Sequence, residues 1–180
     1  MPQDRRFVVI TGGPGSGKST LIEALAQRGY ARTPEAGRGV IVDQVGIGGS
    51  GVPWRDEVLF AELMLSWELR SYRWAQSCPG VVFFDRGMPD LVGFLRVRGR
   101  EVPAHVDAAA RGFGYRREVF LAPFWPEIYG VDAERGQSPE EAEATFHAMV
   151  DAYTEYGYRL LVLPKSSVAE RVDFVLDALR

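Results

Sequence analysis

The stretch FVVITGGPGSGKSTLIEALAQ, from Phe7 to Gln27, decides the fold. It begins with a short apolar and β-branched run that ends at a glycine, which is typical of a buried strand. A glycine-rich turn follows, and after it comes an apolar segment with helical period that stops before Gly29. A strand, a flexible turn and a helix in this order place several backbone amides at the start of the helix, where an anion is favoured.

The turn itself is a recognisable motif. Residues 12–19, GGPGSGKS, match the pattern G-x-x-x-x-G-K-[ST] at every fixed position. Its glycines let backbone N–H groups converge on a phosphate, Lys18 reaches the outer phosphates, and the Ser19 hydroxyl ligates Mg²⁺. We therefore predict a nucleoside-triphosphate site, with ATP and Mg²⁺ as ligands. The residues assigned to the nucleotide are Gly13, Pro14, Gly15, Ser16, Gly17, Lys18, Ser19 and Thr20.

Strands and helices are expected to alternate along the rest of the chain. The patterns predict strands at 6–11, 30–33, 81–85, 118–121 and 158–163, and helices at 18–28, 35–45, 56–76, 89–98, 103–111 and 138–156, with a last one from 167. This alternation indicates an α/β fold: a three-layer P-loop NTPase domain over 1–180, with a mostly parallel five-stranded sheet and helices on both faces. Because helix 56–76 is apolar on almost every side, we expect it in the middle of the fold.

The apolar run VVFFD ends abruptly in Asp85. In parallel sheets, ligands bind beyond the carboxyl ends of the strands. We therefore expect Asp85 to hold a magnesium-bound water beside the glycine turn, although capping of the following turn is an alternative. Arg86 comes next and is expected either to point toward phosphate or to lie on the surface.

Composition excludes several classes of protein. The 180 residues carry a net charge of −3, so nothing predicts a nucleic-acid surface. Cys78 is the only cysteine, which excludes an intrachain disulfide and a cysteine-based metal cluster. With no apolar run of bilayer length, we expect a cytoplasmic protein without a membrane partner. We expect the protein to be a monomer or a homodimer. The Asn-Lys-x-Asp element of guanine-specific switch proteins is absent, and large ring ATPases need a longer chain.

Three further segments carry a resemblance to a known family. They are RTPEAGR at 32–38, FFDRG at 83–87, and APFWPEIYGVDAERGQS at 122–138. With the glycine turn, they make the whole chain resemble the P-loop small-molecule kinases that include ribosylnicotinamide kinases and deoxynucleoside kinases. The chain is most similar to a bacterial subgroup described as predicted ATPases or kinases.

The resemblance implies roles for residues around the acceptor. In the relatives an acid after the second strand takes the proton from the substrate hydroxyl, and here that acid is Glu35. A glutamate at a helix start is also favoured by the helix dipole, so a purely structural cap is an alternative. Asp85 is a second candidate for the base. Arg38 lies one helical turn beyond Glu35, and the resemblance implies that Arg38 and Arg86 contact the substrate.

The resemblance also implies a lid at about 122–137. In the relatives an Asp-x-x-Arg turn of the lid brings an arginine onto the transferring phosphate, and here the turn contains Asp132 and Arg135. Trp125 and Tyr129 are expected either to stack on a base or sugar or to pack on the neighbouring helix. The loop after the last strand, with Lys165, would line the adenine pocket; a solvated lysine without that role is the alternative.

Two functions fit these expectations. The first is a kinase that moves the γ-phosphate of ATP to a small hydroxylated acceptor, nucleoside-like or another metabolite. The alternative is an ATPase or nucleotide-gated regulatory module that acts on a protein partner. The loop at 46–53, GIGGSGVP, matches no acceptor motif, so the sequence does not identify the acceptor.

Overall fold

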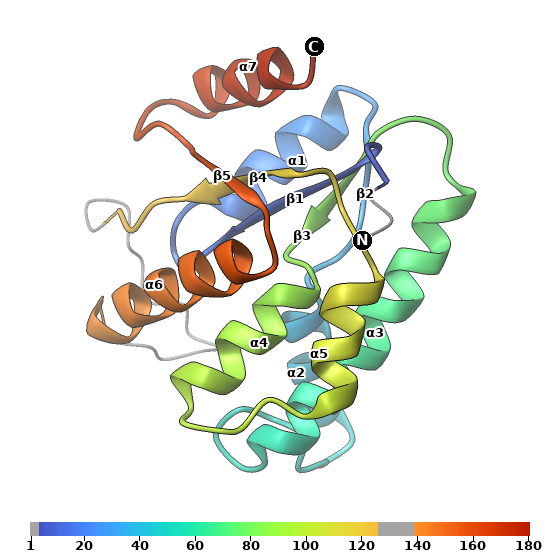
Figure 1. Cartoon of the computed structure of the whole chain (residues 1–180), viewed down its shortest axis with the longest axis vertical. Helices are drawn as coiled ribbons and strands as arrows, with labels where there is room; N and C mark the ends of the chain where they lie inside the picture. Colours follow the sequence, from blue (N-terminus) through green and yellow to red (C-terminus); the bar gives the residue numbers. More distant parts are fainter. Residues whose placement is uncertain (1–3, 126–138) are drawn as a thin grey trace.

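The computed structural model describes residues 4–125 and 139–180 (Figure 1). The strands are β1 (Phe7–Gly12), β2 (Ala31–Arg32), β3 (Val82–Asp85), β4 (Glu118–Ala122) and β5 (Arg159–Val162). The helices are α1 (Lys18–Gln27), α2 (Ala36–Gly46), α3 (Glu57–Ser77), α4 (Met88–Val97), α5 (Ala104–Gly112), α6 (Pro139–Glu155) and α7 (Val168–Ala178). Every predicted strand and helix is present, with ends displaced by one or a few residues.

The five strands form one sheet in the order β2-β3-β1-β4-β5. All of the paired strands run parallel, so the α/β architecture predicted from the alternation is confirmed. Ile10 of β1 lies beside Asp85 of β3, and Gly12 lies beside Ala122 of β4. The register thus brings the glycine turn and the acid of the VVFFD run to the same edge of the sheet.

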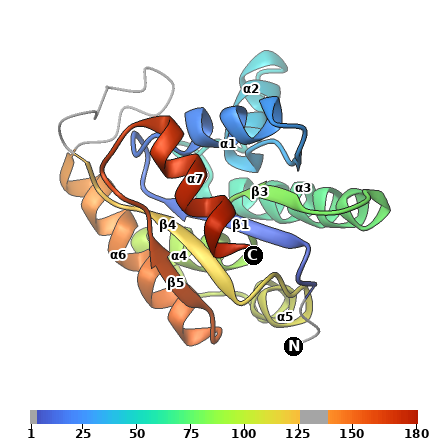
Figure 2. The same cartoon turned by 90° about the horizontal axis from the view of Figure 1, so that it is seen from above.

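Helices cover both faces of the sheet, as Figures 1 and 2 show. Val8 and Ile10 belong to a core cluster with α1 and α7, whereas Phe7 and Val9 belong to the larger cluster formed with α2 to α6. Alternate residues of β1 therefore face opposite layers, and all of them are buried. A strand that is apolar on both sides suits this central position.

The expected position of α3 was wrong. The side chains of Val58 and Trp74 are 49% and 48% exposed, so the helix has a face in solvent. Its other face packs against α2 and α4 and buries Phe60 and Met64. The prediction assumed that every apolar residue of this helix is buried, and the apolar residues on its outer face are not.

Two other boundaries differ from expectation. The strand β2 is only two residues long and lies at an edge of the sheet, shorter than the predicted 30–33. Ala122, expected as the first residue of the lid, is the last residue of β4. The remainder of the predicted lid from 126 onward lies outside the described residues. In the described part of the chain, no helix has the length and apolar character needed to cross a bilayer.

Candidate functional site

The glycine turn between β1 and α1 adopts a conformation that requires its glycines. Gly12 has a φ of 135°, and a Cβ atom at this position would lie 2.4 Å from the carbonyl oxygen of Ala122. Gly15 and Gly17 have φ values of 67° and 75°, in the left-handed region that side chains disfavour. Gly17 immediately precedes α1, whose first residue is Lys18. The loop therefore leads its backbone directly into the positive end of a helix.

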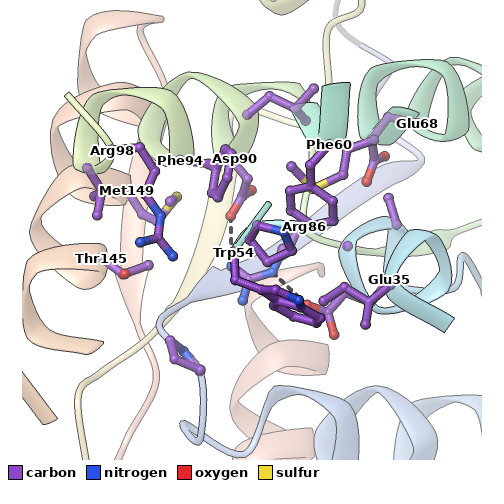
Figure 3. A pocket seen from close by; sticks show the side chains of 18 residues that line it. Glu35, Trp54, Phe60, Glu68, Arg86, Asp90, Phe94, Arg98, Thr145 and Met149 are labelled. Carbon is purple, nitrogen blue, oxygen red and sulfur yellow. Dashed lines mark hydrogen bonds and ion pairs between the residues drawn. The ribbon is translucent and has the colours of Figure 1, made fainter. Parts of the chain in front are cut away.

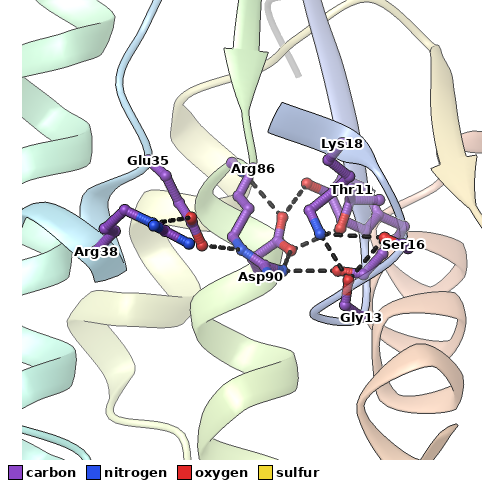
Figure 4. A network of polar contacts seen from close by, with 11 residues as sticks. Thr11, Gly13, Ser16, Lys18, Glu35, Arg38, Arg86 and Asp90 are labelled. Carbon is purple, nitrogen blue, oxygen red and sulfur yellow. Dashed lines mark hydrogen bonds and ion pairs between the residues drawn. The ribbon is translucent and has the colours of Figure 1, made fainter. Parts of the chain in front are cut away.

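Lys18 lies over this loop (Figure 4). Its ammonium group donates hydrogen bonds to the carbonyl oxygen of Gly13 over 2.6 Å and to the Ser16 hydroxyl over 3.3 Å. The Ser16 hydroxyl also donates to the Gly13 carbonyl oxygen, over 2.7 Å. Lys18 is buried, whereas Ser19 and Thr20 in the first turn of α1 are exposed. The loop thus concentrates one buried positive charge and the amino end of a helix at the carboxyl edge of the sheet.

Asp85 ends β3 beside this loop. It is buried, and within residues 4–125 and 139–180 its Oδ1 atom has no hydrogen-bond partner. Burial, and then the negative charge of Glu35, raise the pKa of Asp85 to about 6, although Lys18 and Arg86 act in the opposite direction. The following turn is capped by Asp90, whose Oδ2 accepts a hydrogen bond from the Gly87 N–H over 2.9 Å. Asp85 therefore has an unsatisfied oxygen and no part in that cap.

These residues fit a magnesium ion held together with a nucleotide. Among the described residues, no three histidine, cysteine or acidic side chains gather as a metal cage. Mg²⁺ does not need one, because it is usually held by one or two carboxylates together with substrate phosphates and water. The buried, unpaired oxygen of Asp85 and the hydroxyl of Ser19 are the groups that would hold it.

Arg86 contacts several parts of the site. Its Nε donates to Glu35 over 3.0 Å, and its Nη1 donates to the Gly12 carbonyl oxygen over 2.9 Å and to Asp90 over 3.2 Å. Burial would lower the pKa of Arg86, but the carboxylates of Glu35, Asp90 and Asp85 raise it above its usual range. Arg86 is largely buried rather than on the surface, and its φ of 75° is the only positive value for a non-glycine residue in the described part of the chain.

Asp90 is a member of the site that the sequence analysis missed. It is buried on α4 and accepts hydrogen bonds from the Thr11 hydroxyl and the Tyr153 hydroxyl, each over 2.6 Å. The same carboxylate therefore connects β1, α4 and α6 with Arg86. One signal was present in the sequence, since Asp90 lies four residues after Arg86 at a helix start, where an acid is favoured.

Glu35 faces the site and does not cap its helix. It occupies the N-cap position of α2, but its side chain makes no capping hydrogen bond. Besides the contact with Arg86, Oε2 of Glu35 lies 3.8 Å from Nε of Arg38, whose side chain is 46% exposed. The structural-cap alternative for Glu35 is therefore not supported, and Arg38 lies at the outer edge of the site.

A cavity of about 180 Å³ opens next to these groups (Figure 3). Pro14 of the glycine turn, Glu35, Arg86 and Asp90 line it on the side of the sheet. Most of its other walls are apolar, and they come from α2, the segment before α3, α3, α4 and α6. The apolar lining residues include Ile41, Pro53, Trp54, Phe60, Met64, Leu91, Phe94, Val97 and Met149. The loop 46–53, which the sequence left without a function, leads into this wall.

Glu68 is a second acid that the sequence analysis missed. It lines the cavity, is only 2% exposed, and its Oε2 has no hydrogen-bond partner in the part of the chain that the structure describes. Burial raises its pKa well above the usual range, and the negative charges of Asp90 and Asp85 add to the effect. The spacing Phe60, Met64, Glu68 was a usable signal, because residues four apart share a helix face.

A buried arginine supports the glycine turn from the other side. Arg171 of α7 is 2% exposed, and its Nη2 donates to the carbonyl oxygen of Ser16 over 3.2 Å. The guanidinium carbon lies 6.0 Å from the centre of the Trp125 ring. Burial lowers the pKa of Arg171. Sequence analysis missed this residue, because nothing in the pattern of α7 distinguishes it from a solvent-exposed arginine.

The remaining predicted residues are farther from this arrangement or outside it. Lys165 is exposed in the loop between β5 and α7. Asp132, Arg135 and Tyr129 lie outside the described residues, so their expected roles stay predictions. The structure thus brings together the glycine turn, Lys18, Glu35, Asp85 and Arg86 at one edge of the sheet.

Comparison with known proteins supports the fold. The sequence model of a family named AAA domain matches residues 7–171. No curated protein matches the sequence. The solved structures in the next paragraph are less than 20% identical to this chain, so they support the fold and not a substrate.

Several solved structures share the fold of the whole chain. Deoxyadenosine kinase from M. mycoides, with dCMP and dCDP bound, is 16% identical with a TM-score of 0.70, and the match covers 96% of this chain and 98% of that one. NadR protein in complex with NR is 17% identical with a TM-score of 0.72; the match covers 97% of this chain but 50% of NadR. Shikimate kinase from Acinetobacter baumannii, with shikimate, is 14% identical with a TM-score of 0.60, covering 98% and 94%. The fold implied by the resemblance to P-loop small-molecule kinases is confirmed.

Proposed function

This chain belongs to the AAA domain family, and from that premise and its kinase-like fold we propose that it transfers the γ-phosphate of ATP to a hydroxyl group of a small molecule. The observation that carries this proposal is the position of the cavity. Pro14 of the glycine turn, Glu35 and Arg86 line the same space, so an acceptor there would adjoin a phosphate held by the turn. Phosphoryl transfer depends mainly on such positioning and on neutralisation of charge.

The proposed roles at the nucleotide follow from the geometry of the turn. Backbone amides of 13–18 and the amino end of α1 hold the phosphates, and Lys18 leaves its contact with the Gly13 carbonyl to neutralise the outer ones. Mg²⁺, held by Ser19 and Asp85, supplies further positive charge to the phosphate oxygens when it is bound. Lys165 lines the adenine pocket, where its exposed position leaves room for a ligand.

Glu35 is the proposed general base. The acceptor hydroxyl oxygen forms a bond to the γ-phosphorus, the bond from that phosphorus to the β–γ bridging oxygen breaks, ADP leaves, and the hydroxyl proton moves to Glu35. Arg86 supports this role because its Nε orients the Glu35 carboxylate at 3.0 Å. Asp85 does not line the cavity, which favours Glu35 over Asp85 as the base.

Three residues complete the proposal. Arg38 at the outer edge and Asp132 contact the acceptor, and Arg135 stabilises the charge on the transferring phosphoryl group. An arginine in that role is worth ~10³–10⁵ in rate in related reactions. Asp132 and Arg135 lie outside the described residues, and their roles rest on the resemblance of the sequence.

The experiment is an acceptor screen. The protein is incubated with ATP and Mg²⁺ and with fractions of a metabolite pool, and ADP release and product masses are measured. A kinase produces many-fold stimulation by one fraction, together with a species heavier by one phosphoryl group, and Lys18→Ala abolishes both. Stimulation by cell protein, with no phosphorylated metabolite in any fraction, would instead support the alternative of a regulatory ATPase.

A further inference from the structure

We propose that Glu68 is the specificity residue of the cavity and that it selects a planar ring whose edge carries a hydrogen-bond donor next to an acceptor, as in a lactam or an amino-substituted nitrogen heterocycle. The inference names the acceptor class for the proposed function. It rests on that function only for the statement that the occupant of the cavity is the acceptor. The recognition itself rests on the cavity.

The first support is the place of Glu68 on α3. Phe60, Met64 and Glu68 follow one another at a spacing of four residues, and all line the cavity (Figure 3). A glutamate on such a face replaces an apolar residue that would pack without any desolvation penalty. Burying a carboxyl group without a hydrogen-bond partner is unfavourable, because its contacts with water are lost and not replaced. The unpaired Oε2 therefore indicates a partner that residues 4–125 and 139–180 do not provide.

The second support is the set of charges that face Glu68. The titratable groups that interact with it are Asp90 and Arg86, after β3, Asp85 at the end of β3, Glu35 before α2, and the buried hydroxyl of Tyr115. Their carboxylates outnumber the one arginine, and Arg86 already donates to Glu35 and Asp90. Burial and these negative charges favour the neutral form of Glu68 by raising its pKa. A neutral carboxyl group presents a carbonyl oxygen that accepts and an O–H that donates, side by side.

The third support is the shape and polarity of the walls. Phe60 and Phe94 pack edge to face with their ring centres 5.3 Å apart, and Trp54 lines the same cavity. Aromatic walls of this kind favour a flat ligand. Arg98, the other arginine that lines the cavity, lies 3.8 Å from Glu57. The cavity is lined by Glu35, Glu68 and Asp90, and each lining arginine has an acidic neighbour. A carboxylate on the ring of the acceptor is therefore unfavourable in this cavity.

The test uses single-ring probes and needs no ATP. Binding of 2-pyridone, toluene and benzoate to the full-length protein is measured by ligand-observed NMR for the wild type, Glu68→Gln and Glu68→Met. Glutamine keeps an adjacent donor and acceptor, whereas methionine keeps the volume and removes both. Circular dichroism melting of each variant checks that it is folded.

We expect 2-pyridone to bind the wild type and Glu68→Gln within about threefold, and Glu68→Met about tenfold more weakly, since two hydrogen bonds are lost. Toluene should bind Glu68→Met at least as well as the wild type, and benzoate should bind none of them. Absence of 2-pyridone binding to the folded wild type, or equal binding to Glu68→Met, would overturn the inference. Either result leaves the acceptor screen unaffected, so the two proposals fail separately.

Discussion

Arg86 donates a hydrogen bond from its Nε to Oε1 of Glu35 over 3.0 Å, across 51 positions of sequence (Figure 4). The same guanidinium reaches the Gly12 carbonyl at the start of the glycine turn. The proposed base, the proposed phosphate site and Asp90 are therefore joined through one side chain. Substitution of Glu35 or Arg86 should therefore affect the other residues of this network.

Glu35→Gln should reduce phosphoryl transfer while it leaves ATP binding close to normal. The amide preserves the shape of the carboxylate and removes its capacity to take a proton, which is worth ~10²–10⁴ in rate. Steady-state kinetics and calorimetric titration of a non-hydrolysable ATP analogue measure the two quantities. Glu23→Gln, in the exposed pair between Glu23 and Arg32, is the control and should change neither. An unchanged kcat in Glu35→Gln would remove Glu35 from the role of base.

Arg86→Met should destabilise the fold by about 3–5 kcal/mol, because Asp90 then loses its cation and Glu35 loses its short contact and keeps the 3.8 Å contact with the half-exposed Arg38. Urea unfolding measures the loss. Arg96→Met is a matched control, since Arg96 forms an exposed 2.7 Å ion pair with Glu155 that should contribute about 0–1 kcal/mol.

A double variant separates this cause from simple loss of packing. In Arg86→Met/Glu35→Gln the carboxylate of Glu35 is absent as well. The loss in the free energy of unfolding should therefore be smaller than the sum of the losses in the two single variants. Strict additivity would show that the contact between Arg86 and Glu35 contributes nothing to stability.

The order of strands and helices was accessible from the sequence because it depends on local patterns. The glycine turn, with Lys18 and Ser19, was equally accessible, since its conformation is fixed by residues adjacent in sequence. Asp90 and Glu68 were missed for the opposite reason. Their surroundings come from segments far apart in the chain, such as Thr11 and Tyr153 around Asp90, so local spacing could place each acid on a helix face but could not show its partners.

The outer face of α3 shows the converse error. Its apolar residues indicated burial on every side, and Trp74 is nevertheless about half exposed. Hydrophobic residues are common on protein surfaces, so a hydrophobic residue in a sequence is weak evidence of burial. A buried polar residue is a more informative observation.

Stability should depend on pH through Glu68. Its pKa is raised above the usual 4.5 in the folded protein, so above pH 4.5 the folded state keeps a proton that the unfolded chain releases. The free energy of unfolding should therefore fall as pH rises through this window, by up to about 1.4 kcal/mol per pH unit for this group. Urea unfolding between pH 5 and 8 measures the slope.

Glu68→Gln should reduce that slope, because the amide does not titrate; Asp85, whose pKa is raised to about 6, accounts for the part that remains. The exposed carboxyl of Asp151 on α6 provides the control, and Asp151→Asn should keep the slope of the wild type. If Glu68→Gln and the wild type lose stability equally with rising pH, Glu68 is ionised in the folded protein.

Arg171→Met should weaken nucleotide binding without weakening the fold. The variant loses the hydrogen bond to the Ser16 carbonyl, which helps to fix the turn, and the Kd for a magnesium-bound ATP analogue should rise about tenfold. The free energy of unfolding should stay equal or increase, because a buried cation is replaced by an apolar side chain. Arg159→Met, at an exposed position on β5, serves as control. Tight binding in Arg171→Met would mean that the turn keeps its shape unaided.

The most direct test of the account is calorimetric titration of AMP-PNP with Mg²⁺ into the wild type and Lys18→Ala. If the turn encloses a triphosphate, the wild type binds one equivalent, binding weakens when EDTA removes the metal, and Lys18→Ala binds at least about 100-fold more weakly while it melts like the wild type. A folded wild-type protein that binds no AMP-PNP, or a Lys18→Ala variant that binds it equally well, would contradict the account.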